Sequence, residues 1–558
     1  MKPTPPIMPR GAAALVFEPD AFRIDGPKLM GRQAAGHNFL RAVVAGRLPN
    51  EVLWAYTRNT KTVNAFDAMA RQLDPSVRTG WAPADRPELL DRIGALHRPD
   101  PNLAPLANLR LRSNPRAWSL TGVTHTTASH GAMGAMVDLL AAPVMPWDAL
   151  ICTSQAVRST VQVLFEAQAE YFRWRLGARH FTLPQLPIIP LGVHCGDFVF
   201  SPEARRSARQ ALGIRDDEVA ALFLGRLSFH AKMHPHVMYT GLEAAARQAG
   251  KSVALLHCGW FSNSNIETHM KECASRFAPS IRSLWSDGRE AAARDQAWAA
   301  ADLFVSLADN IQETFGLTPI EAMAAGLPVV ISDWNGYKDT VRDGIDGFRI
   351  ETWMPPSPLG DSYNLQYEAG TLDYDRYLGF LCQHVSMDRR QLVERLAALI
   401  ADPALRYSMG ASGRLRARTE FDWSVVYAQY RALWEHLADL RAHGPEVAAP
   451  PILGAVPQRM EPFRAFANYP SHTLGPRTLV QRLETTADWP SLRQHPLFNY
   501  AESILPSPEL AEALLAPLQS QQPLALETLA QLAEVSVETA MLACSSLAKA
   551  GFIELGEG

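Results

Sequence analysis

Two carboxylates at a fixed spacing, Glu313 and Glu321, are the first residues in this sequence that suggest chemistry. They lie in the run N-I-Q-E-T-F-G-L-T-P-I-E-A-M-A-A-G-L-P at residues 310–328. Carboxylates accept hydrogen bonds from hydroxyl groups, and a glutamate inside a helix points back toward the start of that helix. The backbone N–H groups of residues 314–317 lie at this start, where they are free to bind an anion. The run therefore suits a sugar diphosphate, which carries both hydroxyls and phosphates.

A pair of cations suited to phosphates lies upstream, in the run G-R-L-S-F-H-A-K at residues 225–232. Arg226 offers a planar fork of donors and Lys232 a point charge, and together they match the two phosphates of a sugar nucleotide. Gly225 starts the loop, directly after an apolar segment at residues 219–224. The alternative, a surface loop with two solvated cations, stays open on these residues alone.

The segments that must position these residues read as alternating strands and helices. Buried apolar runs at residues 301–307 and 328–332 flank the carboxylate motif, and a helix is expected between them. Further strand-like runs lie at residues 13–18, 52–56, 118–124, 147–153, 186–193, 219–224, 253–258 and 281–285. Strands that alternate with helices predict parallel sheets with crossover helices. The predicted fold class is therefore α/β.

The run at residues 310–328 resembles the signature of the retaining glycosyltransferases of family 4 (glycosyl transferases group 1). In that signature two glutamates are separated by seven residues, in the context E-T-F-G-L-x-x-x-E-A-M-A-x-G-x-P-V-V. The resemblance implies the GT-B fold, two Rossmann-like doubly wound domains that face a cleft. It also implies transfer of a hexosyl-type sugar from a nucleotide-diphosphate donor to a hydroxyl acceptor, with retention of the anomeric configuration. Glycan, glycolipid or glycoconjugate synthesis, such as polysaccharide biosynthesis, is the implied setting.

The resemblance also assigns roles to single residues. Glu313 would hold the donor sugar and Glu321 the ribose hydroxyls, while Arg226 and Lys232 would neutralise the departing diphosphate. The implied catalytic set is Glu313, His125, Arg226 and Lys232, and the implied donor-binding set is Gly225, Arg226, Lys232, Glu313, Thr314, Phe315, Gly316, Leu317 and Glu321. Neither a cofactor nor a metal is expected, because the two cations and the backbone N–H groups would stabilise the developing charge.

Three features of the pattern leave alternatives open. His125 follows a strand in H-T-T-A-S-H and would face the cleft near the transferred sugar, and a hydrogen-bonded residue at a helix start is the alternative. Gly31 and Gly36 bound a glycine-containing loop that the family turns toward the diphosphate and the acceptor, with a plain loop as the alternative. The D-Y-D run at residues 373–375 matches a metal motif of other transferases, but its place before an amphipathic helix favours acids at a helix start.

The sequence is expected to divide into five regions. They are an N-terminal acceptor domain at residues 1–195, a donor domain at 196–422, a crossover helix at 423–443 that packs on the N-terminal domain, a proline-rich linker at 444–480 and a helical accessory module at 481–558. The crossover helix carries an apolar stripe at helical spacing. The family resemblance ends at the linker.

The C-terminal module resembles a small winged helix, with a helix, a turn at residues 535–536, a second helix and a strand. Residues 521–558 carry one cation, Lys549, against the acidic residues Glu527, Glu534, Glu538, Glu554 and Glu557. Binding to nucleic-acid phosphates requires Lys and Arg to release counterions. We therefore expect no nucleic acid partner, and expect this module to dimerise or dock a partner protein. A catalytically silent GT-B scaffold that acts through the module is the alternative function, and a nucleic-acid-binding regulator is the least favoured one.

Composition places the chain among ordinary soluble proteins. At 558 residues, with 47% hydrophobic and 20% charged residues, it predicts two or three domains. Six separated cysteines with no C-x-x-C pair predict reduced thiols in the cytoplasm. No apolar run reaches the length of a membrane span. Contact with the inner face of a membrane stays open, because Arg173, Arg175 and Arg179 lie near Trp174 in a chain whose first 200 residues hold 21 Lys and Arg against 15 Asp and Glu.

Overall fold

The structure is a computed structural model that describes residues 11–23, 31–447, 459–520 and 522–557. The chain forms two compact units, residues 1–456 and 457–558. Part of the predicted proline-rich linker, residues 448–458, lies outside the described residues. Within the described ranges, every helix falls short of the length or the apolarity that crossing a membrane needs.

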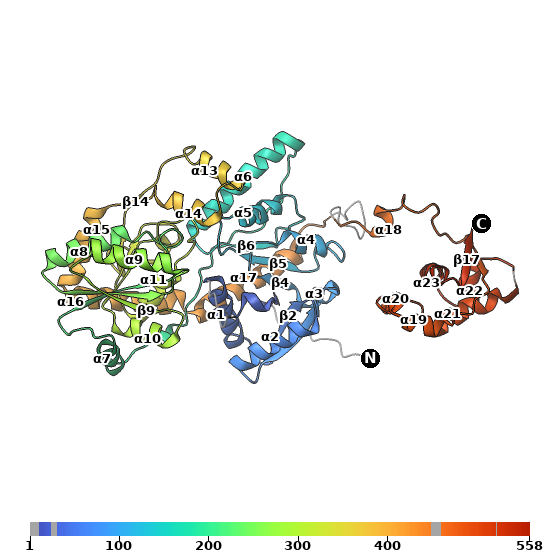
Figure 1. The fold of residues 1–558 in the computed structure, drawn as a ribbon, viewed down its shortest axis with the longest axis horizontal. Helices are drawn as coiled ribbons and strands as arrows, with labels where there is room; N and C mark the ends of the chain where they lie inside the picture. The colour runs from blue at the N-terminus through green and yellow to red at the C-terminus, as the bar shows by residue number, and fades with distance from the viewer. Residues whose placement is uncertain (1–10, 24–30, 448–458, 521, 558) are drawn as a thin grey trace. The chain divides into compact units, whose positions relative to one another are not determined.

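The first unit contains two parallel sheets of six strands each (Figure 1). The first sheet has the order β3-β2-β1-β4-β5-β6, and all its pairings are parallel. Its strands are β1 (Ala14–Val16), β2 (Val52–Thr57), β3 (Arg78–Pro83), β4 (Ala95–Arg98), β5 (Ser119–Val123) and β6 (Ala149–Ile151). A central first strand from which the chain builds outward on both sides is the order of a doubly wound, Rossmann-like sheet.

The second sheet repeats this order as β12-β11-β10-β7-β8-β9, again with parallel pairings. Its strands are β7 (Val219–Leu224), β8 (Val253–Gly259), β9 (Arg282–Asp287), β10 (Leu303–Ser306), β11 (Val329–Ser332) and β12 (Gly347–Ile350). Two doubly wound sheets within one compact unit make the GT-B architecture that the sequence predicted.

Strand β7 shows why this sheet is covered on both faces. Its alternate side chains pack into two separate apolar clusters, Val219, Ala221 and Phe223 in one and Ala220, Leu222 and Leu224 in the other. Successive side chains of a strand point to opposite faces, so a continuous apolar run needs helices on both. The longer helices of the unit are α1 (Gly31–Ala45), α2 (Thr60–Leu73), α5 (His130–Val137), α6 (Gln155–Leu176), α7 (Pro202–Ala211), α8 (His236–Ala249), α9 (Ser264–Phe277), α10 (Ala291–Ala300), α11 (Leu317–Ala325), α15 (Arg389–Ala401) and α16 (Pro403–Arg416).

Helix α17 (Trp423–His443) packs on the first sheet, against β5 and helix α1. The residues of its predicted apolar stripe are all buried, namely Trp423, Val426, Tyr427, Tyr430, Leu433, Trp434 and Leu437. Val193 N donates to Phe421 O (2.8 Å) and Trp423 N donates to Val193 O (3.0 Å) where the chain enters this helix. The helix thus joins the end of the second half of the unit to the core of the first.

The segment at residues 186–193 differs from its predicted strand, because it forms only isolated bridges, at Ile188 and Val193. Pro187 and Pro190 lack a backbone N–H, which interrupts any ladder of hydrogen bonds. Strands β3 and β4, by contrast, were not predicted at all. The sequence T-G-W-A-P of β3 contains a glycine and a proline, which hide it from a propensity-based prediction.

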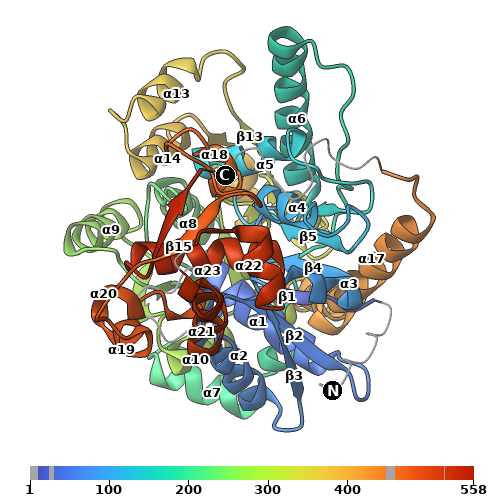
Figure 2. The same cartoon turned by 90° about the vertical axis from the view of Figure 1, so that its right-hand side faces the viewer.

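Helix α6 begins after Ser154, whose Oγ accepts from Val157 N (3.3 Å) and caps the helix. The C-terminal end of this helix extends beyond the neighbouring elements in both views (Figure 1 and Figure 2). Trp174 is 78% exposed there, between Arg173 and Arg175. An exposed indole between two guanidinium groups has the composition of an interfacial surface, and membrane contact stays a prediction.

The second unit has its own apolar core and a small antiparallel sheet of order β16-β15-β17. Its strands are β15 (Leu479–Arg482), β16 (Leu524–Ala525) and β17 (Ile553–Gly556), and helices α22 (Leu526–Leu532) and α23 (Val537–Lys549) precede the last strand. The predicted order of helix, turn, helix and strand is therefore present. Strand β15 begins within the predicted linker, and local pattern did not reveal it because its partners come much later in the chain.

Candidate functional site

Asn310 connects the two loops that the sequence singled out. Its Oδ1 accepts from the backbone N–H groups of Gln312 (3.0 Å) and Glu313 (3.1 Å), and its Nδ2 donates to Lys232 O (2.6 Å). The backbone oxygen of Asn310 accepts from Trp334 Nε1 (2.8 Å). Asparagine commonly caps its own loop in this way. Sequence reasoning missed this positioning role, although an asparagine in the loop after a strand is a recognisable turn signal.

Lys232 and Glu313 form an ion pair across these loops, with 2.5 Å between Nζ and Oε2. Their side chains are only 21% and 15% exposed. Burial raises the pKa of Glu313, but the Lys232 ammonium outweighs this effect and holds that pKa below its ordinary value. Burial lowers the pKa of Lys232 and the Glu313 carboxylate more than reverses this, so the net shift is upward. Both groups are therefore charged at neutral pH.

Glu321 lies on helix α11, where burial raises the pKa of its carboxyl to about 7. The charges of Arg294 and Lys232 act in the opposite direction and are weaker. Within the described part of the chain, no side chain or backbone group is hydrogen-bonded to this carboxyl. The two predicted carboxylates thus differ in state, because Lys232 pairs closely with Glu313 alone.

Gly316 makes the turn that starts helix α11. Its φ is +96°, and a Cβ at this position would lie 2.2 Å from the ring of Tyr337. Tyr337 is buried and its hydroxyl is 2.9 Å from Ser306 Oγ at the end of β10. A glycine is therefore required by both conformation and space. The N–H groups of Phe315 and Thr314, predicted to be free for an anion, instead stabilise the Glu313 carboxylate.

Arg226 lies on the same loop as Lys232 and its charge lowers the pKa of that lysine, which places the two cations near each other. Arg226 Nη2 donates to Ala231 O (3.0 Å), so the loop folds back on itself. Gly225, with φ +151°, brings the backbone beside Lys232. The structure thus brings Arg226, Lys232, Glu313 and the start of α11 together at the carboxyl ends of β7 and β10. In open parallel sheets this is the edge at which ligands bind.

His125 is brought to the motif by Thr314. Thr314 Oγ1 donates to His125 O (3.0 Å), and Ser154 Oγ donates to Thr314 O (2.8 Å). Thr314 is buried, and these bonds tie the motif to the loops after β5 and β6. The residue predicted to bind the donor therefore also joins the two halves of the unit.

The predicted glycine loop at Gly31 and Gly36 is wrong, because both residues lie within helix α1. A Cβ at Gly36 would lie 2.2 Å from Ala21 O, so this glycine permits close packing of the helix on the preceding chain. In contrast, Asp373 confirms the interpretation as a helix start. Its carboxylate accepts from Arg376 N (2.8 Å) and caps helix α14 (Tyr374–Cys382).

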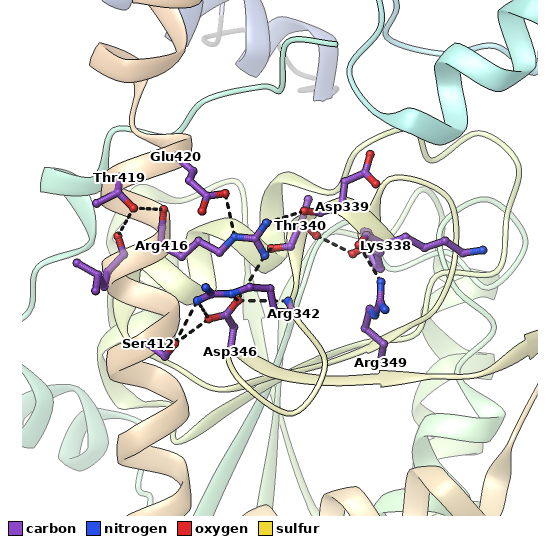
Figure 3. A network of polar contacts seen from close by, with 12 residues as sticks. Lys338, Asp339, Thr340, Arg342, Asp346, Arg349, Ser412, Arg416, Thr419 and Glu420 are labelled. Carbon is purple, nitrogen blue, oxygen red and sulfur yellow. Dashed lines mark hydrogen bonds and ion pairs between the residues drawn. The ribbon is translucent and has the colours of Figure 1, made fainter.

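A polar network fixes the segment that follows strand β11 (Figure 3). Buried Asp346 accepts from Arg342 Nη2 (2.7 Å), Ser412 Oγ (3.0 Å) and Arg416 Nη1 (3.4 Å). Arg416 also donates to Asp339 O (3.0 Å). Asp339 Oδ2 accepts from the backbone N–H of residue 155 (2.6 Å), at the start of α6. The network therefore connects helix α16 to the same interface that Thr314 crosses.

Comparison with known proteins finds a family model that matches the segment around the site. Residues 204–353 match the family model for Glycosyl transferases group 1. This segment contains Arg226, Lys232, Glu313 and Glu321, and it ends directly after strand β12 and the short strand β13 (Thr352–Trp353). The match therefore falls on the residues that carried the resemblance in the sequence.

Several curated relatives share the name D-inositol 3-phosphate glycosyltransferase. The D-inositol 3-phosphate glycosyltransferase of Segniliparus rotundus is 27% identical over 217 residues, which are 38% of this chain and 45% of that protein. The protein of the same name from Geodermatophilus obscurus is 33% identical over 174 residues, 29% of this chain and 36% of that protein. The chain thus matches less than half the length of these relatives.

One solved structure that matches this chain is that of HepE from Anabaena, in complex with UDP-glucose. It shares 16% of its residues with this chain, and the superposition covers 77% of this chain and 99% of HepE with a TM-score of 0.47. At that similarity the complex says nothing about the ligand of this chain.

Proposed function

We propose that this protein is a retaining glycosyltransferase of the family 4 type, which moves a sugar from a nucleotide-diphosphate donor to a hydroxyl acceptor. The observation that carries the proposal is the group of Arg226, Lys232 and Glu313 at the ends of two adjacent parallel strands, inside the segment that matches the family model. Two cations beside a carboxylate suit a ligand with a charged diphosphate and a hydroxylated sugar.

The proposed chemistry rests on charge. As the bond between the anomeric carbon and the diphosphate oxygen breaks, negative charge grows on the diphosphate, where Arg226 and Lys232 stabilise it. Glu313 exchanges part of its contact with Lys232 for hydroxyls of the donor sugar, and Glu321 accepts from the ribose hydroxyls. His125 lies beside the transferred sugar. These residues orient the donor for attack by the acceptor hydroxyl.

The test measures release of nucleotide diphosphate from UDP-, GDP- and ADP-sugars by the full chain, with Lys232→Met and Glu313→Gln as variants. Each variant is expected to lower turnover by about 10²–10³, the usual cost of removing one group that stabilises developing charge. Lys338→Met removes an exposed lysine of the same domain and serves as the matched control. Activity is expected to persist in EDTA, and NMR of the product is expected to show the anomeric configuration of the donor.

Binding of a nucleotide diphosphate without turnover of any donor would overturn the enzymatic proposal and favour a silent scaffold. Inversion of the anomeric centre would overturn the retaining mechanism alone. Loss of activity in EDTA that is restored by a divalent cation would contradict the assignment of charge stabilisation to Arg226 and Lys232.

A further inference from the structure

A segment between two paired strands lies against the site, directly after the part of the chain that matches the family model. Residues 354–385 (the insert) begin directly after the family match ends at residue 353. Strands β13 and β14 (Ser386–Met387) pair antiparallel and close the two ends of the insert. Between them lie helices α13 (Asp361–Glu368) and α14, and after them helix α15 packs on α8. The insert is thus an excursion from the second domain.

The insert contacts both halves of the first unit next to the proposed catalytic residues. Leu378 of α14 packs with Ala128, in the loop that follows β5, and with Ala231, the neighbour of Lys232. The ring of Tyr367 lies 3.8 Å from that of His130 at the start of α5, centroid to centroid. Burial raises the pKa of Tyr374 and the nearby Thr126 side chain partly opposes this shift. Helix α14 is therefore held beside the loop that carries His125.

A hollow of about 780 Å³ lies between the insert and the Arg226–Lys232 loop. Its aromatic lining comes from both sides, Phe229 and His230 on the loop and Tyr374 and Phe380 on α14. Phe380 is 44% exposed although it is apolar. The volume is that of a small-molecule site, and partly exposed rings facing a hollow offer flat apolar surfaces to a ligand.

The polar residues that line the hollow limit the charge and the chemical class of its ligand. Asp375 and Gln383 offer hydroxyl-binding groups, and Asp375 Oδ2 lies 3.9 Å from His230 Nε2. The hollow holds two carboxylates, those of residues 373 and 375, against the single guanidinium of Arg376. This charge balance disfavours a phosphate group. A neutral pyranose ring fits, because it presents C–H groups on its face to aromatic rings and hydroxyls at its edge to carboxylates and amides.

We propose that the insert forms an acceptor subsite of this protein, within residues 196–422 that the family resemblance assigned to the donor, and that it takes a neutral pyranoside. The proposal rests on the proposed function, because it supplies the acceptor for the donor bound at Lys232 and Glu313. His230, which lines the hollow, lies two positions from Lys232, so the hollow and the proposed diphosphate site share one loop. Phe380 supplies the apolar face and Asp375 the hydroxyl contact. Acceptor choice is then a property of the insert rather than of the family motif.

The test measures binding of methyl glucopyranosides, mannopyranosides and galactopyranosides to the full chain by saturation-transfer NMR, with and without UDP, GDP or ADP. Phe380→Ala and Asp375→Asn are expected to weaken binding of the pyranoside by about tenfold, as loss of a central contact does. Affinity for the nucleotide is expected to stay unchanged in both. Two variants serve as controls. Tyr407→Ala removes a ring that is 81% exposed on α16, and Asp361→Asn removes an exposed carboxylate of α13. Both are expected to bind the pyranoside as tightly as the parent does.

The proposal is overturned if no pyranoside of the panel binds the parent protein, or if Phe380→Ala and Asp375→Asn bind it as tightly as the parent. It is also overturned if myo-inositol 1-phosphate binds in its place and is lost in the same variants, since the hollow then takes a phosphorylated polyol. Failure of the proposed function is separate, because it appears as absence of nucleotide binding or of donor turnover in the parent. Circular dichroism of each variant excludes loss of fold as the cause.

Discussion

At the scale of single residues, two glutamates of the site differ in pKa because their surroundings differ. Glu313 and Glu321 are both partly buried, yet the pKa of Glu313 is lowered while burial raises that of Glu321 to about 7. The difference follows from the 2.5 Å contact of Glu313 with Lys232. Glu313 therefore meets a ligand as a charged group that already has a partner, while Glu321 changes its charge near neutral pH.

Asp309, next to Asn310, allows a test of how burial of a carboxyl group affects stability. It is 3% exposed, and burial raises the pKa of its carboxyl from 3.8 to about 7. Below pH ~4 the carboxyl is protonated in folded and unfolded chains alike. Stability is lost between pH ~4 and pH ~7, where the unfolded chain ionises this carboxyl while the folded state keeps it protonated, and the loss has its full size above pH ~7. Asp309→Asn removes this loss and is expected to be more stable than the parent at pH ~8, by on the order of 3 kcal/mol.

Unfolding in denaturant near pH 4 and near pH 8 checks this prediction, with exposed Asp361→Asn as the control. The backbone N–H of His234 donates to the Asp309 carboxyl (3.2 Å), and an asparagine oxygen can accept the same bond. Equal stability of parent and variant at both pH values would contradict the predicted cost of the buried charge.

At the scale of elements, the turn before helix α11 decides how the motif is presented. Gly316 has φ +96° and contacts the Tyr337 ring, while Gly344 has φ +74° with nothing within 4 Å of an added Cβ. Gly316→Ala is expected to lower stability by about 2–4 kcal/mol, because strain and a steric clash add. Gly344→Ala meets strain alone, at about 1 kcal/mol. Thermal unfolding of both variants measures the difference, and equal losses would show that the Tyr337 ring moves aside.

The network around Asp346 holds helix α16 against the segment after β11 (Figure 3). Asp346→Asn removes the charge that faces Arg342 and Arg416, and Arg416 is only 12% exposed. The loss of stability is expected to be about 3 kcal/mol, since the buried carboxylate loses its charged hydrogen bonds to two guanidinium groups. Asp343→Asn, at an exposed carboxylate that accepts from Arg349 N (2.8 Å), is expected to cost less than about 1 kcal/mol. Denaturant unfolding distinguishes the two, and similar losses would contradict the role of the network.

At the scale of the whole molecule, the chain has separate cores in its two units. Among the residues that the structure describes, the core of the second unit is built from side chains between Val480 and Leu555. Because neither core shares residues with the other, calorimetry is expected to show two unfolding transitions. A chain of residues 1–456 is expected to keep the transition of the first unit and donor-dependent release of nucleotide. A single transition in the full chain that shifts on truncation would show that the units stabilise each other.

The sequence by itself determined those features that depend on neighbours along the chain. The six apolar residues of β7, the cap of α6 at Ser154 and the stripe of α17 each follow from local periodicity or a local hydrogen bond. The full run of residues 310–328 around Glu313 and Glu321 likewise identified the motif. The prediction at Gly36 was wrong for a related reason, since a glycine that permits helix packing has the same local signal as a glycine in a loop.

Only the tertiary structure decided how distant segments meet. Lys232 and Glu313 are 81 positions apart, and Thr314 and His125 are 189 positions apart, so no periodicity connects them. Parallel strands place such loops at one edge of a sheet, and the resulting contacts fix the charges of the carboxylates and the position of His125. The insert is the clearest case, because its aromatic residues acquire a shared hollow only when α14 packs on the loops of both domains. Local sequence specifies elements, whereas the environment of a side chain depends on which elements the fold brings together.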